Sequence, residues 1–267
     1  MGEIRIECHE KWDWVHLELG RANAVGPDFL TAMDETLGTL SALGDPPGFE
    51  LDRASRPVLL TGQGAAFSAG LDLTTLLQFD REEMEAFVRQ FDHVFRRIAT
   101  LPRPTIAVVN GHAVAGGTVL ALACDVRIGA DATPKGTSYV LGLKESAIGL
   151  PVPSIVAEIV DVSLPPGARR NEIVLTGSLY APQDALAVGL LDQVVPASEL
   201  TSLAESVAQT FTQSTGRATR RLKEQLRPAL HEGLTTARDD EAFLDAWFSP
   251  ETQRRITAVV ESLAKRG

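Results

Sequence analysis

The chain has 267 residues, 44% of them hydrophobic and 22% charged, a balance typical of a globular protein with a sizeable core. Its 25 basic and 35 acidic side chains give a formal net charge of -10, which argues against a nucleic-acid-binding face. Two cysteines without CxxC spacing and five scattered histidines predict neither disulfides nor a metal site. No apolar run reaches the ~18 residues that a membrane span needs. Because the first residues are strand-like rather than signal-like, we expect a cytoplasmic protein with no membrane partner.

Apolar periodicity predicts the elements of the first half of the chain. Strands are predicted over 3–9, 12–19, 57–62, 105–110 and 126–130. Helices are predicted from Pro27, near Asp72, over 81–99 and after Gly116, and the composition of 44–48 indicates an exposed loop. Because strand, loop and helix recur in this order, we expect an α/β core with right-handed crossovers.

The second half of the chain is predicted to be mainly helical from Pro153 onward, apart from a strand-like segment at 190–195. The last helices are expected over 197–213, 216–230, 236–247 and 250–265. We interpret them as a separate C-terminal bundle. This places a boundary between a core of residues 1–196 and a helical region of residues 197–267.

The first candidate site is the turn between the buried strand at 105–110 and the apolar helix after Gly116. The first N–H groups of a helix lack intrahelical partners and lie at the positive end of its dipole, which suits a phosphate or an oxyanion. The glycines here match neither G-x-G-x-x-G nor a P-loop. A purely structural alternative is that Gly116 and Gly117 only permit close helix packing.

The second candidate site is the heptapeptide Phe-Ser-Ala-Gly-Leu-Asp-Leu at 67–73. We do not expect Ser68 to be a hydrolase nucleophile, because Ala66 stands where G-x-S-x-G needs its first glycine. The turn itself offers backbone N–H donors, with Leu71 as the expected one, and Asp72 can lie near the positive end of a helix.

The third candidate is Glu145, which lies among apolar residues on a segment bracketed by Gly142 and Gly149. Glutamate is seldom buried without a partner. Burial would raise the pKa of its carboxyl group, as a general base working near neutral pH requires. The alternative is a surface salt bridge involving Glu145 and Lys144.

Taken together, these three segments resemble the crotonase superfamily, the enoyl-CoA hydratases and isomerases, and the segment at 181–196 extends the resemblance. The family implies a spiral of ββα units followed by a helical trimerisation region, and hence a homotrimer or a dimer of trimers. It implies acyl-CoA thioester substrates and no cofactor apart from the coenzyme A of the substrate. Its oxyanion hole maps onto the N–H groups of Leu71 and Gly116.

The resemblance also implies a branch of the family. Hydratases use two glutamates, of which the second matches Glu145, whereas the first falls at Val119, which is apolar. This difference makes the chain most similar to the Δ3,Δ2-enoyl-CoA isomerases, with Glu145 as the single acid and base. The coenzyme A moiety is expected along Ser68, Ala69, Gly70 and Asp72, with Lys144 lining the same pocket. Arg21 and Lys223 are further candidates for phosphate contacts.

Two other interpretations stay open at this level. The chain could be an acyl-CoA-binding homologue without catalytic activity, although it retains Glu145. It could also catalyse another crotonase reaction, such as weak enoyl-CoA hydration or thioester hydrolysis, but it offers no second acid for one. The sequence does not specify the acyl chain length.

Overall fold

The computed structural model describes residues 2–20, 22–42, 55–233 and 240–265. The described residues form two sheets. The six strands of the larger sheet lie in the order β1 (Glu3–Cys8), β2 (Asp13–Glu18), β3 (Val58–Gly62), β5 (Thr105–Val109), β7 (Val126–Ala130) and β9 (Gln193–Val195). Within it, β1 and β2 are antiparallel and every other neighbouring pair is parallel. The smaller sheet is parallel and consists of β4 (Ala66–Ser68), β6 (His112–Val114) and β8 (Leu141–Gly142).

The chain alternates between the two sheets and then forms a helix. After β1, β2 and α1 (Pro27–Ala42), strands β3 and β4 are followed by the short α2 (Leu73–Leu76) and by α3 (Arg81–Ala99). Strands β5 and β6 precede α4 (Gly116–Ala123), and β7 and β8 precede η2 (Ser146–Ile148) and α5 (Ser154–Ser163). This repetition is a spiral of ββα units, which confirms the predicted fold class.

The central elements follow directly from their sequences. Every residue of β5 and of α4 is buried, in keeping with their predominantly apolar composition. The amphipathic α3 begins with a capping box, in which Asp80 accepts a hydrogen bond from the Glu83 N–H and the Glu83 carboxylate accepts one from the Asp80 N–H. These elements form the core against which the smaller sheet is placed.

Some boundaries differ from the prediction. Strands β4, β6 and β8 were not predicted, because two or three residues are too few to show a period. The strand expected at 190–195 covers only Gln193–Val195. The helix expected at 216–230 is divided into α9 (Gly216–Leu226) and α10 (Pro228–Glu232), because Pro228 has no N–H and disfavours a helical conformation at Arg227. The loop expected at 44–48 lies outside the described residues.

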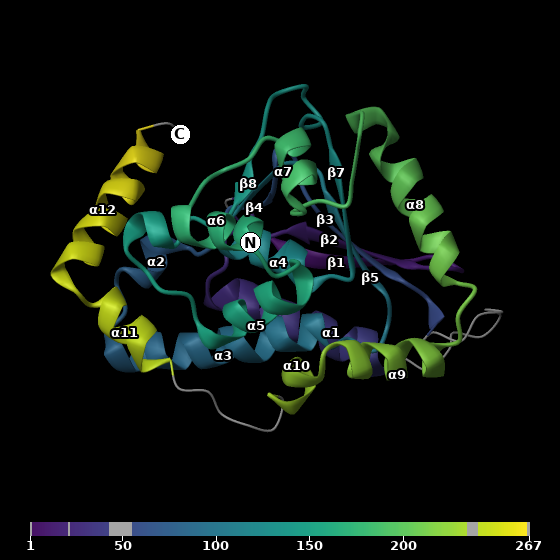
Figure 1. The fold of residues 1–267 in the computed structure, drawn as a ribbon, viewed down its shortest axis with the longest axis horizontal. Helices are drawn as coiled ribbons and strands as arrows, with labels where there is room; N and C mark the ends of the chain where they lie inside the picture. Colours follow the sequence, from purple (N-terminus) through teal and green to yellow (C-terminus); the bar gives the residue numbers. More distant parts are fainter. Residues whose placement is uncertain (1, 21, 43–54, 234–239, 266–267) are drawn as a thin grey trace.

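The helices of the C-terminal part contact the core one by one, in place of the separate bundle that we expected. After α6 (Ala168–Thr176), α7 (Pro182–Val188) and η3 (Ala197–Glu199), α8 (Leu200–Phe211) packs on β3, β5 and β7. Helix α10 packs on α3 and α5, α11 (Glu241–Trp247) packs on α3, and α12 (Pro250–Ala264) packs on α2 and η2. Figure 1 shows α8 and α12 at opposite ends of the molecule. The domain boundary at residue 196 stays a prediction.

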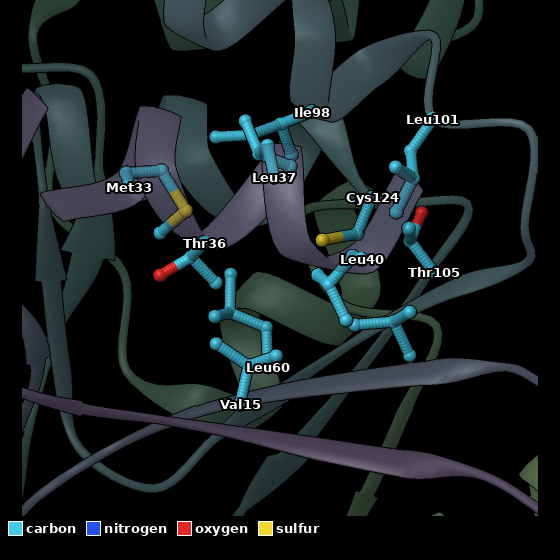
Figure 2. Close-up of a pocket in the computed structure, with 11 residues that line it drawn as sticks. Val15, Met33, Thr36, Leu37, Leu40, Leu60, Ile98, Leu101, Thr105 and Cys124 are labelled. Carbon is cyan, nitrogen blue, oxygen red and sulfur yellow. The ribbon is translucent and has the colours of Figure 1, made fainter. Parts of the chain in front are cut away.

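A small apolar pocket lies between α1, α3 and the larger sheet. Figure 2 shows side chains of α1 lining this pocket, with Leu37 beside Ile98 of α3, and with Val15 and Leu60 of the strands on another side of the pocket. Burial raises the pKa of the Cys124 thiol to about 12, so the thiol stays neutral. Because this pocket is lined by core residues and by none of the three candidate segments, we interpret it as a packing space in the core.

A buried ionic group joins the start of β2 to the segments that precede β3 and β5. The Asp13 carboxylate lies 2.6 Å from the Arg103 guanidinium and 3.5 Å from that of Arg56. All three side chains are almost completely buried. Breaking such a pair is strongly destabilising because it leaves a buried charge less well compensated.

We therefore expect Arg103→Met to lower the free energy of unfolding by about 3 kcal/mol, measured by urea denaturation. The matched control is Arg89→Met, which removes an exposed ion pair with Glu85 on α3 and is expected to change stability little. Equal effects of the two substitutions would contradict a structural role for the buried group.

Candidate active site

The three strands of the smaller sheet end at the same edge, because the sheet is parallel. Two ladder hydrogen bonds align β6 with β8, from the Ala113 N–H to the Val140 carbonyl (3.1 Å) and from the Ala115 N–H to the Gly142 carbonyl (2.8 Å). The chain that leaves this edge after β4, β6 and β8 carries the three candidate segments in turn. The sheet thus gathers segments that are far apart in the sequence.

Two backbone N–H groups meet where the first two segments touch. Neither the Leu71 N–H nor the Gly116 N–H has a hydrogen-bond partner among the described residues. A methyl group on Gly116 would lie 3.7 Å from the Leu71 nitrogen, so the two donors are close together. Gly70 has φ +82°, and a methyl group on it would lie 2.4 Å from the Val114 carbonyl oxygen. Only glycine permits this approach of the two turns.

The residue before Gly116 has an unusual backbone conformation. Ala115 has φ 50° and ψ -119° and is the N-cap of α4 without a side-chain capping bond. A positive φ is strained for alanine, and such strain is found at functional sites whose surroundings over-determine it. Here the strained residue directly precedes the free N–H at the positive end of a helix. Nothing in the sequence pattern signalled Ala115.

The packing interpretation of the glycine turn is correct for Gly117. A methyl group on Gly117 would lie 2.1 Å from the Ser68 carbonyl oxygen, so this glycine allows α4 to pack against β4. The Thr118 side chain connects α4 to β6 and β8. Its hydroxyl donates to the Ala113 carbonyl (2.6 Å) and accepts a hydrogen bond from the Gly142 N–H. The sequence analysis assigned no role to Thr118.

The side chains of the segment after β4 have structural partners. The buried Ser68 hydroxyl donates to the Asn23 carbonyl (2.8 Å) and accepts from the Gly70 N–H. Asp72 caps α2, because its carboxylate accepts from the Thr75 N–H and hydroxyl. Both side chains therefore hold the shape of the turn around the Leu71 N–H. Contacts of this segment with coenzyme A stay a prediction.

The third segment presents Glu145 at the start of η2. The residue as a whole keeps some exposed surface, yet its Oε2 atom is buried and has no hydrogen-bond partner among the described residues. Burial raises the pKa of the Glu145 carboxyl to about 7, and the nearby N–H groups of Glu145 and Lys144 offset this only in part. Such an acid can both accept and return a proton near neutral pH.

The alternative of a surface salt bridge for this segment has no support among the described residues. Across the described ranges, neither Glu145 nor Lys144 forms a salt bridge. Val119 lies in the first turns of α4 and is completely buried in the core. The position at which a second carboxylate would be expected is thus apolar and packed.

Two further expectations concern phosphate contacts. Lys223 is buried and donates to the Asp125 carboxylate (2.7 Å) and to the Arg103 carbonyl (3.0 Å), so it does not face a ligand. The sequence could not reveal this pairing, because Lys223 and Asp125 are 98 residues apart in the chain. Arg21 lies outside the described residues.

The described residues contain neither a candidate membrane span nor a candidate metal-binding cluster. None of their helices combines the length and apolar character needed to cross a membrane. Within the same ranges, no group of three or more His, Cys, Asp or Glu side chains is arranged to hold a metal ion.

Comparison with known proteins agrees with this geometry. The family model for enoyl-CoA hydratase/isomerase matches residues 31–264. The mitochondrial enoyl-CoA delta isomerase 1 of Mus musculus is 32% identical over 192 residues, which are 71% of this chain and 64% of that protein. The short-chain-enoyl-CoA hydratase of Clostridium acetobutylicum is 28% identical over 243 residues, 90% of this chain and 87% of that protein.

Among solved structures, human mitochondrial delta3-delta2-enoyl-CoA isomerase superposes with a TM-score of 0.86 at 26% identity and covers 99% of both chains. The fold and the sequence matches together define a crotonase-type protein. The chain belongs to the enoyl-CoA hydratase/isomerase family. It is an enzyme of that family, whose relatives include both hydratases and isomerases.

The buried carboxylate makes a prediction for stability. The pKa of Glu145 in the folded protein, about 7, lies above its ordinary value of 4.5, so folding disfavours the ionised form. The contribution of this group to stability is complete below pH ~4.5 and is lost as the pH rises through ~7. The unfolding free energy of Glu145→Gln minus that of wild type should therefore rise by up to about 3 kcal/mol as the pH is raised from 4.5 to 8.

This difference is measured by urea denaturation of both proteins across that pH range. Glu261→Gln, on an exposed position of α12, gives the effect of the same chemical change in solvent. A difference between wild type and Glu145→Gln that does not change with pH would show that the Glu145 carboxylate is hydrated.

Proposed function

We propose that this enzyme isomerises 3-enoyl-CoA to 2-enoyl-CoA by a 1,3-proton shift, with Glu145 as the only acid and base. The observation that carries the proposal is a buried carboxyl group with a pKa raised to about 7, whose Oε2 has no hydrogen-bond partner among the described residues. It lies on the same sheet edge as two N–H groups that lack partners in the same ranges. The names of the mouse and human relatives support it, because both are enoyl-CoA isomerases.

In the proposed mechanism, the ionised Glu145 removes a proton from C2 of the thioester. The C–H electron pair moves toward the carbonyl carbon, and the thioester oxygen gains enolate character. The Leu71 and Gly116 N–H groups donate hydrogen bonds to this oxygen. The protonated Glu145 then returns the same proton to C4, the double bond moves from C3–C4 to C2–C3, and the carboxylate is regenerated without any co-reactant.

Magnitudes support the assignment of these roles. A positioned general base contributes typically ~10²–10⁴ to the rate. Each oxyanion donor contributes on the order of 3 kcal/mol in the transition state. Because both donors are main-chain groups, the conformation of the two turns matters more to catalysis than the Leu71 side chain.

The preference for isomerisation over hydration rests on Val119. Hydration needs a group that activates water and a group that handles the proton at the neighbouring carbon. In this chain the first position is an apolar side chain buried in α4. A 1,3-shift needs only one carboxylate that serves both carbons, so a single Glu145 suffices.

The remaining substrate contacts follow the same proposal. Coenzyme A would lie along Ser68, Ala69, Gly70 and Asp72, with Lys144 beside it, and no further cofactor takes part. Ala69 is an exposed residue of this turn, and its N–H donates to the Ala22 carbonyl (2.9 Å). Assembly as a homotrimer or a dimer of trimers is part of the proposal.

The direct test is Glu145→Gln assayed on a trans-3-enoyl-CoA, with the conjugated product followed by absorbance. We expect the turnover to fall by ~10²–10⁴, because the amide cannot accept the proton. Glu261→Gln serves as the control, and product analysis separates isomerisation from hydration. Unchanged turnover of Glu145→Gln would refute the proposed mechanism.

A second test distorts the oxyanion turn without touching a side chain of the site. In Gly70→Ala the new methyl group would meet the Val114 carbonyl, and we expect kcat to fall by ~10²–10³, as for the loss of one donor. Gly136→Ala is a matched control, because Gly136 has a similar φ of +75° with no atom within 4 Å of the added carbon. Equal activities of the two variants would remove the support for an oxyanion role.

A further inference from the structure

Helix α12 contacts the elements that follow two of the proposed catalytic groups. It packs on η2, which begins directly after Glu145, and on α2, which begins two residues after Leu71. The buried face of α12 carries Thr252 and Ile256, which are 3% and 0% exposed. One helix close to the C-terminal end of the chain thus spans from the base segment to the oxyanion segment (Figure 1).

Two side chains of α12 hydrogen-bond the backbone of the turn that carries Glu145. The Thr252 hydroxyl donates to the Gly149 carbonyl (3.3 Å), and the Arg255 guanidinium donates to the Ala147 carbonyl (3.4 Å). Within the turn, the Ile148 and Leu150 N–H groups donate to the Glu145 carbonyl. The η2 turn is therefore held from inside by its own backbone and from outside by α12.

The α11–α12 unit is itself tied to the core at its other end. The Asp240 carboxylate accepts hydrogen bonds from the Ser154 N–H and hydroxyl at the start of α5, both at 2.7 Å. Arg81 at the start of α3 contacts the Glu241 and Asp245 carboxylates of α11. Because its neighbour is anchored in this way, α12 can act as a fixed support for η2.

We propose that Thr252 and Arg255 are positioning residues, which hold η2 from α12 and thereby fix the Glu145 carboxylate in its buried place. Their role as aids to catalysis rests on the proposed function, whereas their effect on the placement of Glu145 does not. Neither side chain is assigned any contact with the substrate. The reason for the effect is that a base displaced by about 1 Å loses on the order of 10²-fold in rate.

Most charged groups on the elements that pack against η2 are paired with one another, and Arg254 and Glu261 of α12 are exposed. On α12, Arg255 pairs with Glu251. On α6, Arg169 pairs with Glu172, and Arg170 pairs with Asp161 of α5. We therefore expect that loosening η2 changes the titration of Glu145 because water enters, and not because a new charge approaches the carboxyl group.

The test compares Thr252→Val combined with Arg255→Met against a matched control, Thr257→Val combined with Arg254→Met. The Thr257 hydroxyl bonds only within α12, to the Gln253 carbonyl, and both control residues are exposed. We expect the first pair to lower kcat about tenfold with a less than about twofold change in KM. The control pair should leave both unchanged.

A second readout does not depend on turnover. The Glu145 carboxyl is titrated in the substrate-free protein by carbon-13 NMR and is assigned as the signal that Glu145→Gln lacks. We expect its midpoint to fall by half a pH unit or more in Thr252→Val/Arg255→Met, because water reaches the carboxylate. Thr252→Ser, which keeps the hydroxyl, should restore both the midpoint and kcat when combined with the native Arg255.

These outcomes separate the two proposals. A wild-type midpoint and a wild-type kcat in Thr252→Val/Arg255→Met would overturn the positioning role, whatever reaction the enzyme catalyses. A lowered midpoint in an enzyme without isomerase activity would support the positioning role and refute the proposed function. If the double substitution prevents folding, the single Thr252→Val is measured in its place, with Thr252→Ser and Thr257→Val as its references.

Discussion

The site depends on the parallel hydrogen-bonded ladder of β4, β6 and β8. Each of these strands is only two or three residues long, and in isolation none would persist. They persist because β3, β5 and β7 of the larger sheet precede them in the spiral and place them side by side. A parallel sheet ends all its strands at one edge, so the three chain segments that follow must meet there. Close contact of the turns then requires glycine at Gly70 and Gly117, where any larger side chain would meet a carbonyl oxygen.

Several features of this edge oppose folding. Ala115 has a positive φ, two N–H groups lack partners within the described part of the chain, and the Glu145 carboxylate is buried without a hydrogen bond at Oε2. Each would be relieved by a small rearrangement of the backbone. The surrounding core resists that rearrangement, because β5 and α4 are buried along their whole length and Thr118 ties α4 to β6 and β8. In the proposed mechanism, the groups that lack partners in the folded protein are those that a thioester enolate would use.

Membership of the enoyl-CoA hydratase/isomerase family does not by itself specify the reaction, which depends on individual side chains of the site. The relatives include proteins named for either activity, so identity alone does not separate the two. The proposed preference for isomerisation rests on Val119, because an apolar side chain within the first turns of α4 cannot activate water. In the proposed mechanism, Glu145 is the only base, and the placement of η2 is therefore more important. Helix α12 supports that turn from the far end of the chain, which connects the C-terminal helices to the chemistry of the core.

By itself, the sequence determined the α/β alternation, the buried strands and the amphipathic α3, because each of these follows from local composition and periodicity. It indicated Glu145 as a candidate buried carboxylate and left a surface salt bridge as the alternative. The family resemblance rested on motifs of the same local kind. Only the tertiary structure decided the existence of β4, β6 and β8, the strain at Ala115, the pairing of Lys223 with Asp125 and the packing of α12 on η2. The physical reason is that a short strand, a strained residue or a buried cation is stabilised by neighbours distant in the chain. Local periodicity records whether a residue is buried, and it carries no information about which distant residue lies against it.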